Sequence, residues 1–109
     1  MTDLLKLDEP EQALASARLP GPFAVLFKRG DLSVELFAPQ GKDTQTPHAQ
    51  DELYIVSSGT ATFRRDQAYT GVNAGDLLFV PAGVDHRFER FSDDFRTWVI
   101  FFGAVHPQH

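Results

Sequence analysis

The fold of this chain is decided by residues 75–90, which read GDLLFVPAGVDHRFER. The apolar run at 76–80 is typical of a buried strand bounded by turn residues. Pro81 ends that strand because proline has no amide hydrogen to give to a sheet, and Gly83 permits the tight connection that follows. In the next strand, period-two alternation places three side chains on one face: His86, Phe88 and Arg90. The stretch therefore predicts a hairpin that directs one imidazole to a fixed position.

The chain around this hairpin is also predicted to be mostly β-structure. Further strands are expected at residues 23–29, 32–38, 52–56, 60–65, 68–72 and 95–102. Turn residues such as Gly30-Asp31 and Ser58-Gly59 separate them. About eight short strands at even spacing predict an antiparallel sandwich or barrel, so the expected fold class is all-β.

A short helix is predicted before the strands. Asp8 and Glu11 have the spacing of a capping box, and a modest apolar stripe follows them. The sequence LPGP at residues 19–22 ends this helix. With 109 residues, we expect one domain over 1–109, with the barrel core at about 22–103.

The composition argues against several classes of function. The formal net charge of −5, with no basic block, argues against non-specific nucleic-acid binding. The absence of cysteine excludes disulfide scaffolds, thiolate metal sites and cysteine nucleophiles within these residues. No secretory signal and no apolar run as long as a membrane span is evident. We therefore expect a cytoplasmic domain without nucleic-acid or membrane partners.

Two histidines and a glutamate form the candidate site. His48 and Glu52 lie four residues apart where a polar loop meets a predicted strand, and His86 lies on the central hairpin. Two imidazoles and one carboxylate are the ligand set of the facial triad that holds non-haem iron(II) and leaves coordination positions open. Gln50 offers an amide oxygen as a neutral fourth ligand, which suits a hard ion better than a soft one. The residues alone leave a second possibility, in which the three groups only hydrogen-bond one another.

Two motifs make the chain resemble a small single-domain cupin of the conserved-barrel type. Three residues match the first cupin motif: His48, Glu52 and Gly59. Four match the second in order and spacing: Gly75, Pro81, Gly83 and His86. The resemblance covers about residues 23–102 and implies a jelly-roll barrel of two antiparallel sheets. The chain departs from the family pattern at Thr46, where the first motif has another histidine, and at Arg90, where the second motif ends in asparagine.

The resemblance implies a divalent metal ion, with iron(II) favoured over manganese, nickel and zinc. Cupins of this kind include dioxygenases, isomerases and lyases, so the leading expectation is a metal-binding cupin that binds or transforms a small anionic organic molecule. Catalytic residues beyond the metal ligands are not identified. Arg90, expected on the face of His86, is a candidate substrate contact, although an internal carboxylate is the alternative partner. Tyr54, on the face of Glu52, is a second candidate contact, with wall packing as its alternative.

Two other functions remain open at this stage. One is a ligand-binding or sensing module without catalysis, and the other is a metal-free structural domain. Small cupins usually form homodimers, and the aromatic last strand at 95–102 supplies an apolar surface for one.

Overall fold

The computed structural model describes residues 23–39, 41, 43 and 48–105. The predicted N-terminal helix and Thr46 lie outside these residues. Eight strands make up the described fold: β1 (Phe23–Arg29), β2 (Leu32–Phe37), β3 (Asp51–Ser58), β4 (Thr60–Arg65), β5 (Ala68–Asn73), β6 (Leu77–Val80), β7 (His86–Glu89) and β8 (Arg96–Phe102). The all-β prediction is confirmed, with strand ends shifted by a few residues at most. Within the described ranges, no helix has the length and apolar character needed to cross a membrane.

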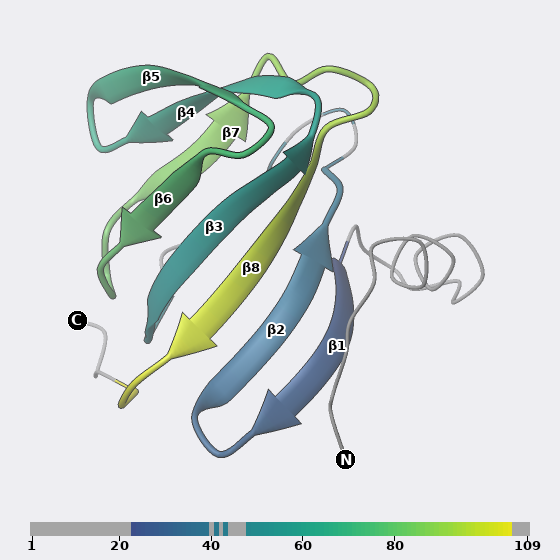
Figure 1. Ribbon diagram of the computed structural model, residues 1–109. Coiled ribbons are helices and arrows are strands. Elements are labelled where there is room, and N and C mark those ends of the chain that lie inside the picture. Colours follow the sequence, from purple (N-terminus) through teal and green to yellow (C-terminus); the bar gives the residue numbers. More distant parts are fainter. Residues whose placement is uncertain (1–22, 40, 42, 44–47, 106–109) are drawn as a thin grey trace.

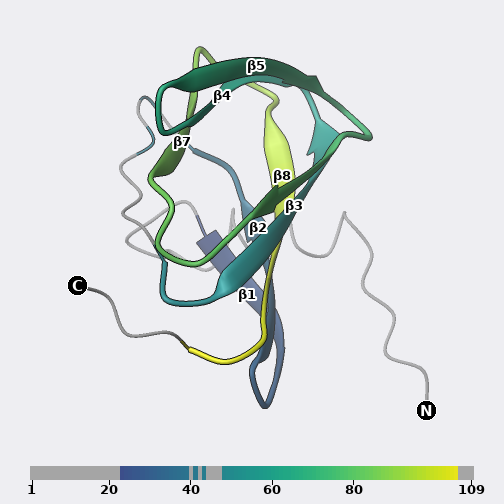
Figure 2. The same ribbon diagram turned by 90° about the vertical axis from the view of Figure 1, so that its left-hand side faces the viewer.

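The strands form two antiparallel sheets that face one another (Figures 1 and 2). The larger sheet has the order β1-β2-β8-β3-β6, and the smaller has the order β5-β4-β7. Neighbours that are distant in sequence, such as β2 with β8 and β3 with β6, show that the chain crosses repeatedly between sheets, as in a jelly roll. The short connection at Gly59 takes the chain directly from β3 in one sheet to β4 in the other.

The core lies between the inward faces of the two sheets. Its buried members are Phe37, Tyr54, Val56, Ala61, Phe63, Val72, Val80, Phe88, Phe95 and Val99. The ring of Phe88 is central, because its centroid lies 4.9 Å from those of Tyr54 and Phe95 and 5.0 Å from that of Phe63. Burying an aromatic side chain of this kind contributes roughly 1.5–3 kcal/mol to stability. The aromatic cluster therefore fixes the strands that carry the candidate site.

Candidate metal centre

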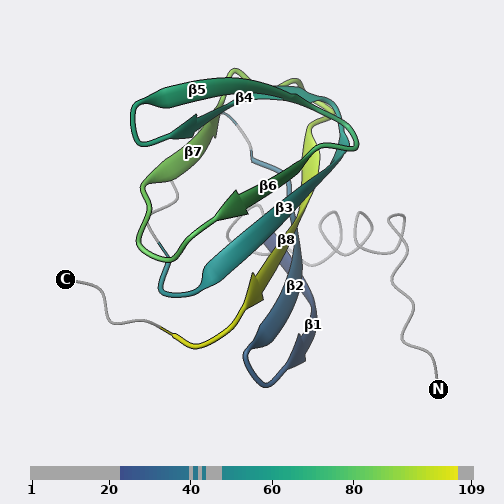
Figure 3. The same cartoon turned by 60° about the vertical axis from the view of Figure 1, so that its left-hand side comes forward.

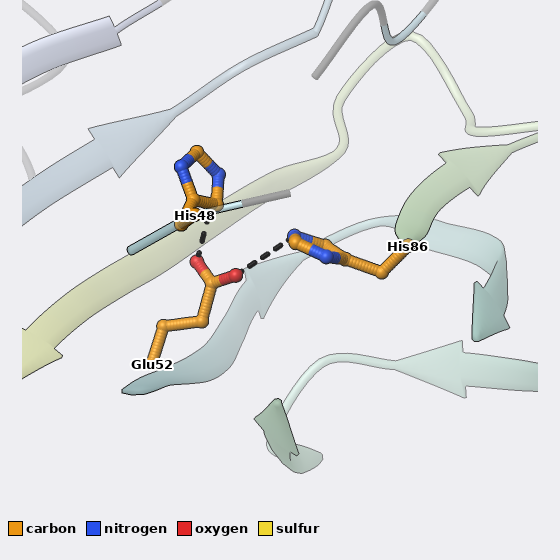
Figure 4. A group of neighbouring side chains, drawn as sticks. All are labelled: His48, Glu52 and His86. Atoms are coloured by element: carbon orange, nitrogen blue, oxygen red, sulfur yellow. Dashed lines mark ion pairs between the residues drawn. The ribbon is translucent and has the colours of Figure 1, made fainter. Parts of the chain in front are cut away.

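The three predicted ligands come together from three segments of the chain (Figure 4). His48 lies in the loop before β3, Glu52 is the second residue of β3, and His86 is the first residue of β7. One oxygen of Glu52, Oε1, lies 2.8 Å from Nε2 of His86, and the other, Oε2, lies 4.0 Å from Nε2 of His48. One ligand atom from each residue lies within 4.8 Å of the other two. Side chains separated by 34 residues thus meet inside the barrel.

Two hydrogen bonds from backbone amides hold the histidine-bearing segments together. The amide of Gly83 donates to the carbonyl of His48 at 2.8 Å. The amide of Ala82 donates to Oδ1 of Asp51 at 2.8 Å. The turn after Pro81 is therefore bound to the loop that supplies the first imidazole, which explains why the second motif needs a tight connection here.

His86 is held in one ring orientation by its second nitrogen. Its Nδ1 lies 2.8 Å from the carbonyl oxygen of Val84, and a carbonyl can only accept, so Nδ1 carries the hydrogen. In the neutral ring, Nε2 then has a lone pair, and it lies 2.9 Å from the hydroxyl of Tyr54. A histidine that gives one N–H to a backbone carbonyl and offers the other nitrogen inward is typical of a metal ligand.

The carboxylate of Glu52 is the part of the site that most needs a cation. Its side chain is only 1% exposed, and neither of its oxygens accepts a hydrogen bond from any described residue. The 2.8 Å approach to His86 is an ion-pair contact that lacks hydrogen-bond geometry. A buried carboxylate without hydrogen bonds is costly unless a cation balances it.

The spacing of the donor atoms suits a metal ion. Neighbouring ligands on an octahedral ion with bonds of about 2.1 Å stand about 3 Å apart. The observed separations from Glu52, 2.8 Å to His86 and 4.0 Å to His48, lie around this value. The side chain of His48 is 28% exposed while that of His86 is fully buried, so solvent reaches the triad from the side of His48. The residues present therefore fit a divalent cation with open positions toward solvent.

The two imidazoles have opposite tendencies to hold a proton. Burial lowers the pKa of His48 and outweighs the attraction of Glu52. Burial also acts to lower the pKa of His86, but contact with Glu52, the Glu52 charge and the Val84 carbonyl together raise it above its ordinary value. A cation that binds His86 therefore competes with a proton more strongly than one that binds His48.

Gln50 is engaged away from the triad. Its amide nitrogen donates to the carbonyl of Asp31 at 2.7 Å and to the carbonyl of Gly103 at 3.0 Å. These bonds tie the β1–β2 turn to the end of β8. They also give the amide nitrogen of Gln50 two acceptors without any metal. Its predicted role as a fourth ligand stays a prediction.

Arg90 does not share the face of His86, and that expectation is wrong. Strand β7 ends at Glu89, and Arg90 has a left-handed φ of 50°, so the alternation that would have turned it inward stops. Arg90 is exposed and lines a surface depression of about 550 Å³ with Thr62, Tyr69 and Glu89. It forms no ion pair with a carboxylate in the described part of the chain.

The sequence reasoning did not single out Glu35, a half-buried carboxyl near the site. Glu35 on β2 faces inward, because the register pairs it with Val99, which in turn pairs with Tyr54. Ser33 donates a hydrogen bond of 3.1 Å to Glu35, while burial and the nearby Glu52 charge raise the pKa of this carboxyl. The signal was present in the alternation of the second strand, which places Ser33 and Glu35 on the side of buried Phe37.

Comparison with known proteins agrees with this fold. The cupin-domain family model Cupin_2 matches residues 33–101. An uncharacterized protein of Streptomyces coelicolor, SCO3923, is 39% identical over 98 residues, which cover 88% of this chain and 91% of that protein. A cupin 2 conserved barrel domain protein of Salinispora arenicola superposes with a TM-score of 0.72 at 21% identity, covering 95% of this chain and 91% of its own.

A further structural neighbour is described by a named activity. It is a putative mannose-6-phosphate isomerase of Ralstonia eutropha, with a TM-score of 0.56 and 28% identity over 78% of this chain and 89% of its own. The family match spans more than half of the sequence and includes both motifs. The chain belongs to the cupin domain family.

Proposed function

We propose that this cupin holds a divalent metal ion through His48, Glu52 and His86 and uses it to bind or transform a small anionic organic molecule. The observation that carries this proposal is the buried Glu52 carboxylate, whose two oxygens accept no hydrogen bond from the described residues while two imidazoles stand beside it. Iron(II) is the preferred ion because two histidines and one carboxylate with open positions are typical of its non-haem sites. Manganese, nickel and zinc follow.

Each residue of the proposed site has its own role toward the metal ion and the ligand. When bound, such an ion supplies a positive charge that polarises an oxygen ligand and, if it is iron, the ability to react with dioxygen. Glu52 neutralises part of that charge, and Val84 fixes the ring of His86 so that its lone pair faces inward. Because Arg90 lies on the outer surface, an anionic ligand at the triad would be balanced by the metal.

Dioxygenation is the leading reaction class, and isomerisation is the second. The likeness to a putative mannose-6-phosphate isomerase favours the second class and an anionic sugar phosphate as ligand. Binding without turnover, as in a sensor module, is the alternative to both. The proposed location of the protein is the cytoplasm, in keeping with a cysteine-free sequence. Cell fractionation tests this location.

Metal content and oxygen consumption test the proposal in order. Protein purified without an affinity tag and reconstituted with iron(II) under anaerobic conditions is expected to retain about one ion per chain by elemental analysis. Oxygen uptake is then measured across a panel of diketones, catechols and small hydroxy acids, with sugar-phosphate isomerisation assayed separately. Retention of metal without turnover favours the sensor alternative. A chain that retains no divalent ion after reconstitution contradicts the proposal.

We also propose that the chain forms a homodimer through the outer face of the larger sheet. Figure 3 shows β6, β3 and β8 side by side in the larger sheet. Leu77 and Phe79 of β6 are 60% and 45% exposed, and the register continues from Phe79 to Leu53 and Ile100. A contiguous apolar sheet face of this kind favours association with a second copy. Light scattering is expected to give twice the 12.2 kDa chain mass. A mass of one chain at micromolar concentration contradicts this assembly.

A further inference from the structure

The outer face of the smaller sheet carries a polar depression that the candidate metal centre does not use. Its lining residues are Thr62, Tyr69, Glu89 and Arg90. Its volume of about 550 Å³ lies within the range of roughly 300–1,000 Å³ that small-molecule sites occupy. The triad lies on the other side of this sheet, because the buried His86 and Phe88 of β7 face the core. The depression and the metal centre are therefore separate places on the protein.

The register of the three strands explains why the face is hollow here. Gly71 on β5 pairs with Thr62 on β4, which pairs in turn with Glu89 on β7. Gly71 has no side chain, and a Cβ added to it would meet no atom within 4 Å. The neighbouring outward residue of β5 is Tyr69, whose side chain is 63% exposed. A row of small side chains beside an exposed aromatic ring thus leaves an open space on the sheet.

The backbone conformation of Arg90 brings its guanidinium to this depression. In a continuing strand, the residue after the outward-facing Glu89 would point inward. Arg90 instead has a left-handed φ of 50°, and its side chain lines the depression together with Glu89. Glycine and asparagine adopt this conformation more readily than arginine, so the turn itself does not require an arginine. The conformation places two opposite charges at the edge of one hollow.

The charges on this face leave an excess of positive charge. Arg64 is paired with Asp85, with Nη1 and Oδ2 3.1 Å apart. Within the described ranges, Arg87, Glu89 and Arg90 take part in no ion pair. Nε of Arg87 is also buried without a hydrogen-bond acceptor among these residues. Two positive charges and one negative charge remain on a chain whose formal net charge is −5, so this face favours an anion.

We propose that the depression binds a small hydroxylated organic anion, such as a sugar phosphate or a sugar acid. Arg90 pairs with the phosphate or carboxylate, for which the guanidinium fork is suited. Glu89 repels a bare anion but accepts hydrogen bonds from hydroxyl groups, as Thr62 does. The exposed ring of Tyr69 packs against the C–H groups of the ligand. Because the site lies outside the barrel, it does not depend on the metal site proposed above.

The test titrates ¹⁵N-labelled protein with glucose 6-phosphate and with gluconate, followed by NMR. At least one of them is expected to bind with a Kd in about the millimolar range, as a few solvent-exposed contacts give. Glucose and inorganic phosphate each lack half of the recognised groups and should bind at least about fivefold more weakly. Amide signals of residues 62, 69, 71 and 89 should shift most. The two anions show whether a phosphate or a carboxylate is preferred.

Two variants remove the site in different ways. Arg90→Asn removes the guanidinium and keeps a residue that tolerates the left-handed φ, and it should weaken binding roughly tenfold or more. Gly71→Leu places a side chain next to Thr62 and should also weaken binding, without backbone strain because the φ of Gly71 is not positive. Arg29→Gln is the matched control, because it alters an exposed arginine of the larger sheet, and it should leave the affinity unchanged.

Treatment with EDTA separates this site from the metal centre. Binding at the depression should be the same before and after treatment, whether or not the triad holds an ion. Loss of binding with EDTA would place the anion at the metal centre and overturn the inference. Inorganic phosphate that binds as tightly as the sugar anions, or an equal effect of Arg29→Gln and Arg90→Asn, would reveal only a general attraction of anions to arginine. Protein that binds neither glucose 6-phosphate nor gluconate overturns the inference as well.

Discussion

His86→Ala is expected to lose stoichiometric metal, with an affinity at least about 100-fold below that of the wild type. His86 is one of the three proposed ligands, and both of its ring nitrogens are engaged, by Val84 on one side and by Tyr54 and Glu52 on the other. Disturbing a partner that merely orients a metal ligand costs 10–100-fold in affinity, so removing the ligand costs more. Metal content after gel filtration and calorimetric titration both measure the loss.

Two further variants test whether metal content depends on the charge of Glu52 and on the histidines of the C-terminal tail. Glu52→Gln keeps the shape of the side chain, removes its charge and should also lose the metal, while relieving the metal-free barrel of a buried carboxylate. Replacing both His106 and His109 in the C-terminal tail removes the other two histidines of the sequence and should leave one bound ion. Circular dichroism confirms that each variant is folded. Unchanged metal content in folded His86→Ala would refute the triad as the binding site.

Gly59→Ala is expected to lower the free energy of unfolding by about 3 kcal/mol or more. Gly59 has a φ of 77°, which an L side chain rarely adopts, and this alone costs about 1–2 kcal/mol. An added Cβ would also lie 2.5 Å from Oγ of Ser92 and 2.6 Å from Cα of Phe95. Overpacking of this kind costs a further 1–3 kcal/mol or so, because backbone must move. Phe95 is a core residue, so the displacement reaches the interior.

Gly30→Ala is the matched control for the backbone term. Gly30 has a similar φ of 57° in the β1–β2 turn, but an added Cβ there meets nothing within 4 Å. It should cost only about 1–2 kcal/mol. Urea denaturation measures both variants, and the difference between them isolates the close approach of β3–β4 to the segment before β8. Equal destabilisation of the two variants would show that the contact with Phe95 relaxes freely.

The prediction from sequence was most complete where short-range rules apply. Strand β6 and the turn at Pro81 follow from a local apolar run and from proline chemistry, and both lie where they were predicted. The convergence of His48, Glu52 and His86 was inferred from their match to two motifs, and the side chains do meet. Their role as metal ligands is carried by the proposal above.

Prediction failed where a local rule stopped applying. Alternation placed Arg90 inside, but alternation lasts only as long as the strand, and β7 ends one residue earlier. The role of Gln50 as a fourth ligand stays a prediction, and nothing in the sequence indicated that its amide nitrogen donates to residues 19 and 53 positions away. Bonds across such separations depend on how the sheets assemble.

The sequence by itself determined the eight strands, the turns between them and the identity of the three side chains at the centre. These depend on periodicity, on glycine and proline, and on motif spacing, all of which act over a few residues. Only the tertiary structure decided which nitrogen of His86 faces Glu52, that Tyr54 lies against it, and that the amide of Gln50 bonds to Asp31 and Gly103. The physical reason is that hydrogen-bond partners and burial are set by the register between strands distant along the chain, which only the folded barrel fixes.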